Sequence, residues 1–95
     1  MRYGSPVLFM IVERFHGADP APVGERFKSH GRMLPNDVVY HASWIEPSGS
    51  RCFQLMETVR PESLTEWISR WKDIADFEVI PVLTSAAFWE KHDDG

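Results

Sequence analysis

The sequence predicts one small α+β domain with its elements in the order strand, helix, strand, strand, helix, strand. An unbroken apolar run over residues 7–12 is typical of a strand that is buried on both faces. A Pro-Ser-Gly-Ser turn at residues 47–50 separates two apolar stretches, which indicates a hairpin. Four large apolar side chains recur at helical spacing: Leu64, Trp67, Ile68 and Trp71. A chain of 95 residues has room for one such domain, residues 1–95.

The first strand and the first helix come from the N-terminal third of the chain. We expect the strand to end at Glu13, where charged residues follow the apolar run. Asp19 is a residue type that caps helix N-termini, and Pro20 fits a first helical turn, where a missing N–H costs nothing. Apolar residues at helical spacing then predict a helix over about residues 21–33, which Pro35 terminates.

The hairpin and the second helix follow. The two hairpin strands are predicted over residues 38–46 and 51–59, on either side of the turn. Pro61 is suited to the first turn of a helix, and the apolar stripe that follows predicts this helix over residues 61–73. This stripe is the clearest amphipathic pattern in the chain, so we expect this helix to supply much of the core.

The last strand and the tail complete the predicted domain. The fourth strand is expected over residues 77–83, and its Pro81 cannot donate to a ladder, which indicates an edge strand. We expect a core over about residues 7–85 and a fraying tail over residues 86–95. The tail still carries Phe88 and Trp89, two aromatic side chains that could dock.

The order of these elements predicts the topology. Each helix connects two parallel strands, and right-handed crossovers place both helices on the same face of one sheet. The expected fold is therefore ferredoxin-like βαββαβ, with a four-stranded antiparallel sheet in the order 4-1-3-2. The first and third strands are central in this arrangement.

One face of this sheet would remain uncovered. The two helices cover a single face, yet the strand over residues 7–12 has no polar position on either face. Four strands of ordinary length expose an area of very roughly 400 Å², which is large for the apolar surface of a monomer. A second copy packed sheet against sheet would close this face, so we expect a homodimer.

Six segments within about residues 7–85 carry a resemblance to a known family: residues 9–15, 31–35, 43–44, 51–57, 66–71 and 77–82. In these segments the chain resembles a small bacterial family of unknown function within the dimeric α+β-barrel superfamily. It implies a dimeric α+β barrel and no single activity. The superfamily includes cofactor-free monooxygenases, haem-degrading enzymes, muconolactone isomerase, chlorite dismutase, ligand-binding modules and stress-response domains.

Composition excludes several classes of partner and cofactor. The net charge is −4 and no basic cluster stands out, so neither a nucleic acid nor an anionic membrane surface is expected as a partner. The apolar run is too short to span a membrane, and the lone Cys52 fits a reducing compartment, so we expect a cytoplasmic protein. The four histidines show no metal-ligand spacing and the glycines form no phosphate loop, so no metal and no cofactor are expected.

The hairpin register places the candidate ligand-binding residues. Pairing Glu46 with Arg51 across the turn sets the remaining partners: Trp44 with Phe53, Ser43 with Gln54, His41 with Met56, and Tyr40 with Glu57. Five side chains of this hairpin are candidates to bind a ligand: Tyr40, His41, Trp44, Gln54 and Glu57. The same register puts His41 about 13 Å from Cys52, which excludes a nucleophilic pair within one chain.

Each candidate also has a structural interpretation. A buried Gln54 amide would bond Ser43 opposite it, and Trp44 could either pack in the core or line a pocket. Glu13 and Glu57 could act as general bases, or could form salt bridges; for Glu13 the simplest partner is Arg51.

Two functions of different classes remain open at this stage. The first is a homodimeric small-molecule-binding or regulatory domain without an evident catalytic set. The alternative is a cofactor-independent enzyme, similar to a monooxygenase or an isomerase, that acts on an apolar or aromatic molecule between sheet and helices. A purely structural dimer is a third option, and it predicts a filled interior. Polar groups that converge on one cavity would distinguish the enzyme from the binding domain, whereas a purely structural dimer predicts no pocket at all.

Overall fold

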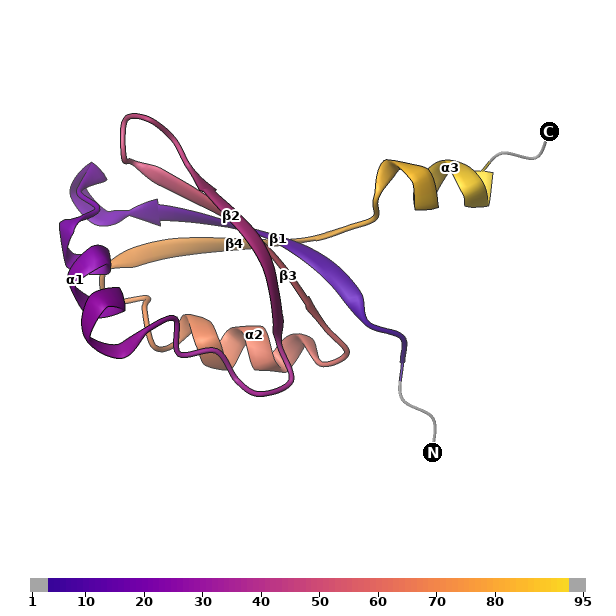
Figure 1. Ribbon diagram of the computed structural model, residues 1–95, viewed down its shortest axis with the longest axis horizontal. Coiled ribbons are helices and arrows are strands. Elements are labelled where there is room, and N and C mark those ends of the chain that lie inside the picture. The colour runs from indigo at the N-terminus through magenta and orange to yellow at the C-terminus, as the bar shows by residue number, and fades with distance from the viewer. Residues whose placement is uncertain (1–3, 93–95) are drawn as a thin grey trace.

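Four strands form one antiparallel sheet in the computed structural model, which describes residues 4–92 (Figure 1). The strands are β1 (Val7–Phe15), β2 (Val39–Ile45), β3 (Arg51–Thr58) and β4 (Ala75–Val82). Their order is β2-β3-β1-β4, which is the order 4-1-3-2 read from the opposite edge. The helices are α1 (Ala21–His30), α2 (Pro61–Ile68) and α3 (Ser85–His92), and a short 3₁₀ turn, η1, spans His16–Ala18. The predicted α+β class and four-stranded antiparallel sheet are confirmed.

The first strand is longer than its apolar run. β1 pairs with β3 and β4 along its length, so the sheet continues through Glu13 to Phe15. The prediction that the strand ends at Glu13 is therefore wrong. Alternation along a strand sends Glu13 to the same face as Ile11 and Phe15, and all three are buried.

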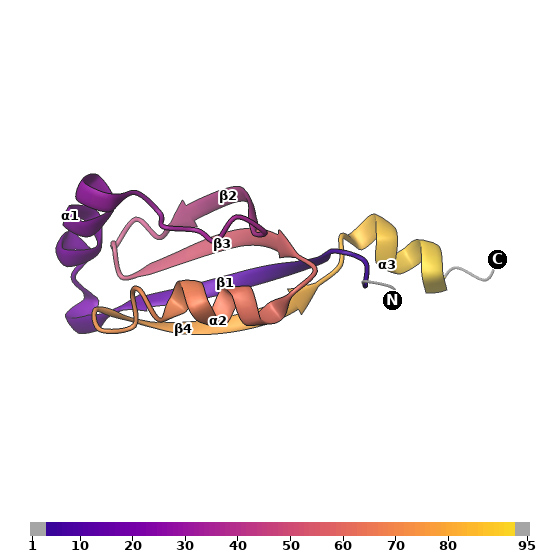
Figure 2. The ribbon, with the colours of Figure 1, turned by 90° about the horizontal axis from the view of Figure 1, so that it is seen from below.

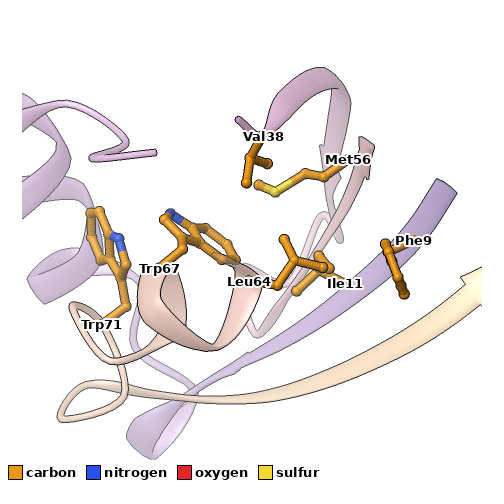
Figure 3. Close-up of a cluster of buried hydrophobic side chains, with 7 residues drawn as sticks. All are labelled: Phe9, Ile11, Val38, Met56, Leu64, Trp67 and Trp71. Carbon is orange, nitrogen blue, oxygen red and sulfur yellow. The ribbon is translucent and has the colours of Figure 1, made fainter. Parts of the chain in front are cut away.

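The core lies between α2 and this face of the sheet. Leu64 and Trp67 of α2 point toward Ile11 and Met56 of the sheet (Figure 3), and each of these four side chains is at most 2% exposed. The α-helix ends at Ile68, earlier than predicted, and residues 69–74 continue as hydrogen-bonded turns. The expected core role of this segment is confirmed, because the turns still bury Trp71.

The first helix does not seal the sheet. α1 lies at one end of the sheet in both ribbon views (Figures 1 and 2), and it contains no buried residue. Arg26 tethers it to the turns after α2 through two 2.8 Å bonds to the Asp73 carboxylate. The helix ends at His30 because Gly31 adopts φ +70°, a left-handed conformation that interrupts helical geometry.

The hairpin carries a one-residue irregularity. The predicted pairs Ser43 with Gln54 and Trp44 with Phe53 are confirmed. The register shifts between Tyr40 and Ala42, so Tyr40 pairs with Met56 instead of Glu57. The predicted partners of Tyr40 and His41 are therefore wrong, because the bulge places one extra residue on β2 and exchanges the faces of everything before it.

The tail forms a helix where fraying was expected. Thr84 Oγ1 accepts a hydrogen bond from the Ala87 N–H, a typical N-cap contact. α3 lies beyond the end of the sheet in Figures 1 and 2 and contributes no buried residue. The radius of gyration of 15.1 Å exceeds the value of about 12 Å expected for a compact domain of this length, which fits a helix that stands clear of the body. No helix within residues 4–92 has the length and apolar character to span a membrane.

Candidate functional site

A cavity of about 290 Å³ lies under α1, between this helix and the sheet. Its floor comes from three neighbouring strands. Glu13 of β1 pairs with Cys52 of β3, and Ser43 of β2 pairs with Gln54. Paired residues share a face of the sheet, so these four side chains all point toward α1 and α2 and line the cavity.

The upper walls are apolar and aromatic. Val23 and Phe27 of α1 line the cavity, and Phe27 is 44% exposed. The indole rings of Trp67 and Trp71 close the side toward α2. The cavity thus combines an apolar wall with a few polar groups on its floor, the usual composition of a small-molecule site.

A continuous chain of hydrogen bonds joins three polar side chains at the cavity. The Arg32 Nε–H donates to Gln54 Oε1 at 3.1 Å, and Gln54 Nε2 donates to Glu13 Oε1 at 2.8 Å. Gln54 is 5% exposed and Glu13 is 3% exposed. Buried polar groups are stable when each has a hydrogen-bond partner. The Gln54 amide is the partner of both Arg32 and Glu13.

The loop after α1 fixes the position of Arg32. Met33 adopts φ +60°, a conformation that is strained for a residue with a Cβ. The loop is held there because the Trp67 and Trp71 indole N–H groups both donate to the Arg32 carbonyl, at 2.9 and 3.2 Å. The guanidinium carbon of Arg32 lies 3.8 Å from the centre of the Tyr40 ring. This stacking holds the side chain beside Gln54.

Burial changes the acid–base behaviour of two groups on the floor. Removal from water raises the pKa of Glu13, against the smaller opposing effects of the Gln54 hydrogen bond and the Arg32 charge. Burial, together with the nearby Glu13 carboxyl, raises the pKa of Cys52 to about 11. The Cys52 thiol is therefore protonated at neutral pH and is a poor nucleophile.

The five residues predicted as ligand contacts lie in three places. Gln54 is on the cavity floor, and Tyr40 stacks on Arg32 beside it. His41 and Glu57 form a 2.8 Å hydrogen bond away from this cavity. Trp44 lies on the opposite face of the sheet and is 54% exposed. The structure thus brings Gln54 and Tyr40 to one site and leaves the other three outside it.

Sequence reasoning named Glu13 as a possible base but gave it the wrong partner, and it did not identify Arg32. Glu13 was expected to pair with Arg51, but Arg51 forms an ion pair with Glu46 instead. Alternation through Phe9, Ile11 and Glu13 is the signal that could have placed this carboxyl on the buried face. No comparable signal exists for Arg32, because a loop fixes its position.

The family model described as "Domain of unknown function (DUF3303)" matches residues 7–95. The chain belongs to the DUF3303 family. No curated protein and no solved structure gave a match. Membership of DUF3303 confirms the predicted family of unknown function and leaves the activity to be argued from the site.

The part of the chain that the structure describes contains no cluster of three or more His, Cys, Asp or Glu side chains able to hold a metal ion. A carboxyl, an amide and a guanidinium can together bind a polar group and move a proton.

The raised pKa of Glu13 predicts a specific pH dependence of stability. The folded protein retains this proton over a pH interval in which the unfolded chain has already lost it. The contribution of Glu13 is therefore most favourable below the ordinary carboxyl pKa and is lost as the pH rises through the raised folded pKa. We expect the stability of Glu13→Gln relative to the wild type to increase as the pH rises above the ordinary carboxyl pKa, as measured by denaturant titrations.

The opposing groups and a control make this test specific. The Arg26 guanidinium lowers the pKa of Asp73 to about 2, which favours folding at higher pH, but this pair is present in both proteins and cancels in the comparison. Glu25→Gln removes an exposed carboxylate of α1 and is the charge control. An unchanged difference between wild type and Glu13→Gln across this pH range would contradict the assignment.

Proposed function

We propose that the protein is a homodimeric small-molecule-binding domain whose ligand occupies the cavity between α1, α2 and the sheet. The observation that carries this proposal is the Arg32–Gln54–Glu13 hydrogen-bond chain, with Gln54 and Glu13 buried, at a cavity whose upper walls are apolar. A purely structural module would gain stability by filling this space with side chains. A small-molecule site needs a few polar groups beside an open volume. Arg32, Gln54 and Glu13 are such groups here.

The uncovered sheet face supports the dimeric part of the proposal. Strand register places an apolar set on this face: Leu8, Met10, Val12, Ala42, Trp44, Phe53, Leu55, Ile80 and Val82. Polar pairs flank the set at its two ends, Arg14 with Glu78 and His41 with Glu57. An apolar centre inside a polar rim is the anatomy of a protein–protein interface, and a second copy presents the same surface about a two-fold axis.

The projecting helix supports the same arrangement. A groove lies between α3 and the end of the sheet, lined in part by Leu83 and Trp89. Leu83 is 54% exposed and Trp89 is 62% exposed. In a sheet-to-sheet pair, α3 would extend the apolar contact beyond the roughly 400 Å² of the sheet itself. The resulting fold is a ferredoxin-like dimeric α+β barrel.

The binding proposal can be tested by filling the cavity from α1. Gly24 lines the cavity, and a Cβ built on it meets no atom within 4 Å. Gly24→Leu therefore places a side chain in the ligand volume without displacing the protein, and it raises helix propensity by about 1 kcal/mol. We expect acetophenone and β,γ-cyclohexenone to perturb the indole signals of Trp67 and Trp71 in wild type, and to have no effect on Gly24→Leu.

Ser29→Leu is the matched control, because it adds the same side chain to an exposed position of α1. This variant should bind both probes as the wild type does. Equal binding by Gly24→Leu would place the ligand elsewhere and contradict the proposed site. Failure of the wild type to bind either probe would favour a purely structural dimer.

A second candidate, a cofactor-independent isomerase, is favoured by one observation. Glu13 is a carboxyl in a largely apolar surrounding, and its raised pKa brings it closer to neutral pH, where a general base is most effective. The isomerase alternative therefore has a base within the same cavity that would hold the ligand.

A further inference from the structure

The Gln54 amide bridges the side chains of Arg32 and Glu13. Its oxygen accepts from Arg32 and its nitrogen donates to Glu13, so the two charged side chains lie one amide group apart. Within residues 4–92, Gln54 is the side-chain hydrogen-bonding partner of both. The terminal nitrogens of Arg32 and the second carboxyl oxygen of Glu13 thus remain for a ligand, and both residues line the cavity.

A carbonyl compound has the same three-atom spacing as this amide. In an amide, the oxygen and the nitrogen are attached to one carbon; in a ketone, the oxygen and the α-carbon are attached in the same way. The Gln54 amide already occupies Arg32 Nε and Glu13 Oε1, so a ketone would accept from a terminal nitrogen of Arg32 and present its α-hydrogen to the second carboxyl oxygen of Glu13. Hydrogen-bond reach between base and proton is the first requirement for general base catalysis.

The cavity limits the size and polarity of such a compound. A volume of about 290 Å³ corresponds to roughly ten water-sized groups, which is enough for a single ring with a short substituent. Phe15, Phe27 and the two indoles contact the hydrocarbon part. The polar groups lie on the floor alone, so the ligand needs one carbonyl end and one apolar end.

We propose that the cavity catalyses a proton shift in a small, mainly apolar enolisable carbonyl compound, with Glu13 as the base and Arg32 bound to the carbonyl oxygen. This inference rests on the proposed function and assigns a substrate class to the same site. The Glu13 carboxylate removes the α-proton, and the C–H electron pair forms a C=C bond while the carbonyl π pair moves to oxygen. The resulting enolate is paired with the Arg32 guanidinium.

The second step returns the proton and completes the balance. With a β,γ-unsaturated ketone as substrate, protonated Glu13 delivers the proton to the γ-carbon of the dienolate. The oxygen electron pair re-forms the C=O bond, the enolate C=C pair moves to the α,β position and the β,γ pair binds the proton, which gives the conjugated isomer and restores the carboxylate. No oxidant, reductant or other reactant is consumed. Cys52 is a neutral thiol beside the site and takes no part. Gln54 is a positioning residue, because it holds both charged groups at the required spacing.

The ionisation of Glu13 depends on the charged and titratable groups on the elements around it. Arg32 from the loop and Cys52 from β3 are the titratable or charged groups that face Glu13 on this side of the sheet. On β1 and β4, Arg14, Asp76 and Glu78 point to the other face. The carboxylate form of Glu13 increases as the pH rises, so the rate of the proton shift should rise with pH as Glu13 ionises.

The test uses β,γ-cyclohexenone as substrate and follows the absorbance of the conjugated product, with deuterium incorporation from heavy water as a second readout. We expect the wild type to accelerate both. Glu13→Gln should lower kcat/KM by about 10²–10⁴-fold while the indole signals still report binding. Glu13→Asp should restore part of the rate, and Arg32→Lys should lower it less than loss of the base does.

Glu25→Gln, an exposed carboxylate of α1, is the control and should retain the wild-type rate. Wild-type binding without isomerisation or deuterium exchange would overturn the proton-shift proposal and leave the binding proposal intact. So would a Glu13→Gln variant that is as fast as wild type. Absence of both binding and turnover would overturn the two proposals together.

Discussion

Met10→Asp is expected to abolish self-association and to raise the dissociation constant of the dimer by about three orders of magnitude. Met10 lies on the uncovered face in a central strand, opposite Leu55 on one side and Ile80 on the other. In a two-fold interface the substitution buries two carboxylates, and burying an unpaired ion costs several kcal/mol. The neighbouring Phe9 faces α2 and is 6% exposed, so it is not part of this surface.

Sedimentation at micromolar concentration should give about twice the 11.0 kDa chain mass for wild type and a single chain for Met10→Asp. Thr65→Asp adds the same charge to the exposed side of α2 and should remain dimeric. If Met10→Asp unfolds, the dimer can be tested with the wild type alone, by measuring its melting temperature at several protein concentrations. The melting temperature of a dimer rises with protein concentration. A wild-type monomer with a concentration-independent melting temperature would contradict the dimer.

Trp67→Ala is expected to lower the free energy of unfolding by about 3–5 kcal/mol, the range for deleting a large buried aromatic side chain. Trp67 is 2% exposed and packs edge-on against Phe77, with ring centroids 5.4 Å apart. Its indole N–H also holds the Arg32 carbonyl at 2.9 Å, so the substitution loosens the loop above the cavity as well as the core.

Trp67→Phe separates these two contributions. It keeps an aromatic ring in the core but removes the indole donor, so its destabilisation should be clearly smaller than that of Trp67→Ala. Both values follow from denaturant titration. A loss below about 1 kcal/mol for Trp67→Ala would show that the α2 stripe is not the centre of the core.

Local patterns account for the parts of the fold that were predicted correctly. The spacing of Leu64, Trp67 and Trp71 repeats with the helical period, and it identified the segment that covers the sheet. The turn at residues 47–50 set the pairing of Ser43 with Gln54, because a hairpin register is fixed by its nearest turn. These features depend on residues that are close in sequence.

The same local reasoning failed where one residue changed the geometry. Tyr40 lies beyond the bulge, so its pairing could not be extrapolated from the turn. Residues 85–92 form a helix although their apolar residues show little helical periodicity. Element boundaries such as His30 depended on the backbone conformation of Gly31, which sequence spacing alone does not determine.

Periodicity and turn chemistry act over a few residues, so local patterns predicted the four strands, the helices α1 and α2, the hairpin and the apolar run of β1. The candidate site was not predicted, because its residues meet through tertiary packing. Glu13 and Gln54 are 41 positions apart and meet through the pairing of β1 with β3. Arg32 reaches them because two indoles from the segment after β3 hold its loop. Such contacts depend on how distant elements pack, and neither residue carries a local pattern that reveals its partner.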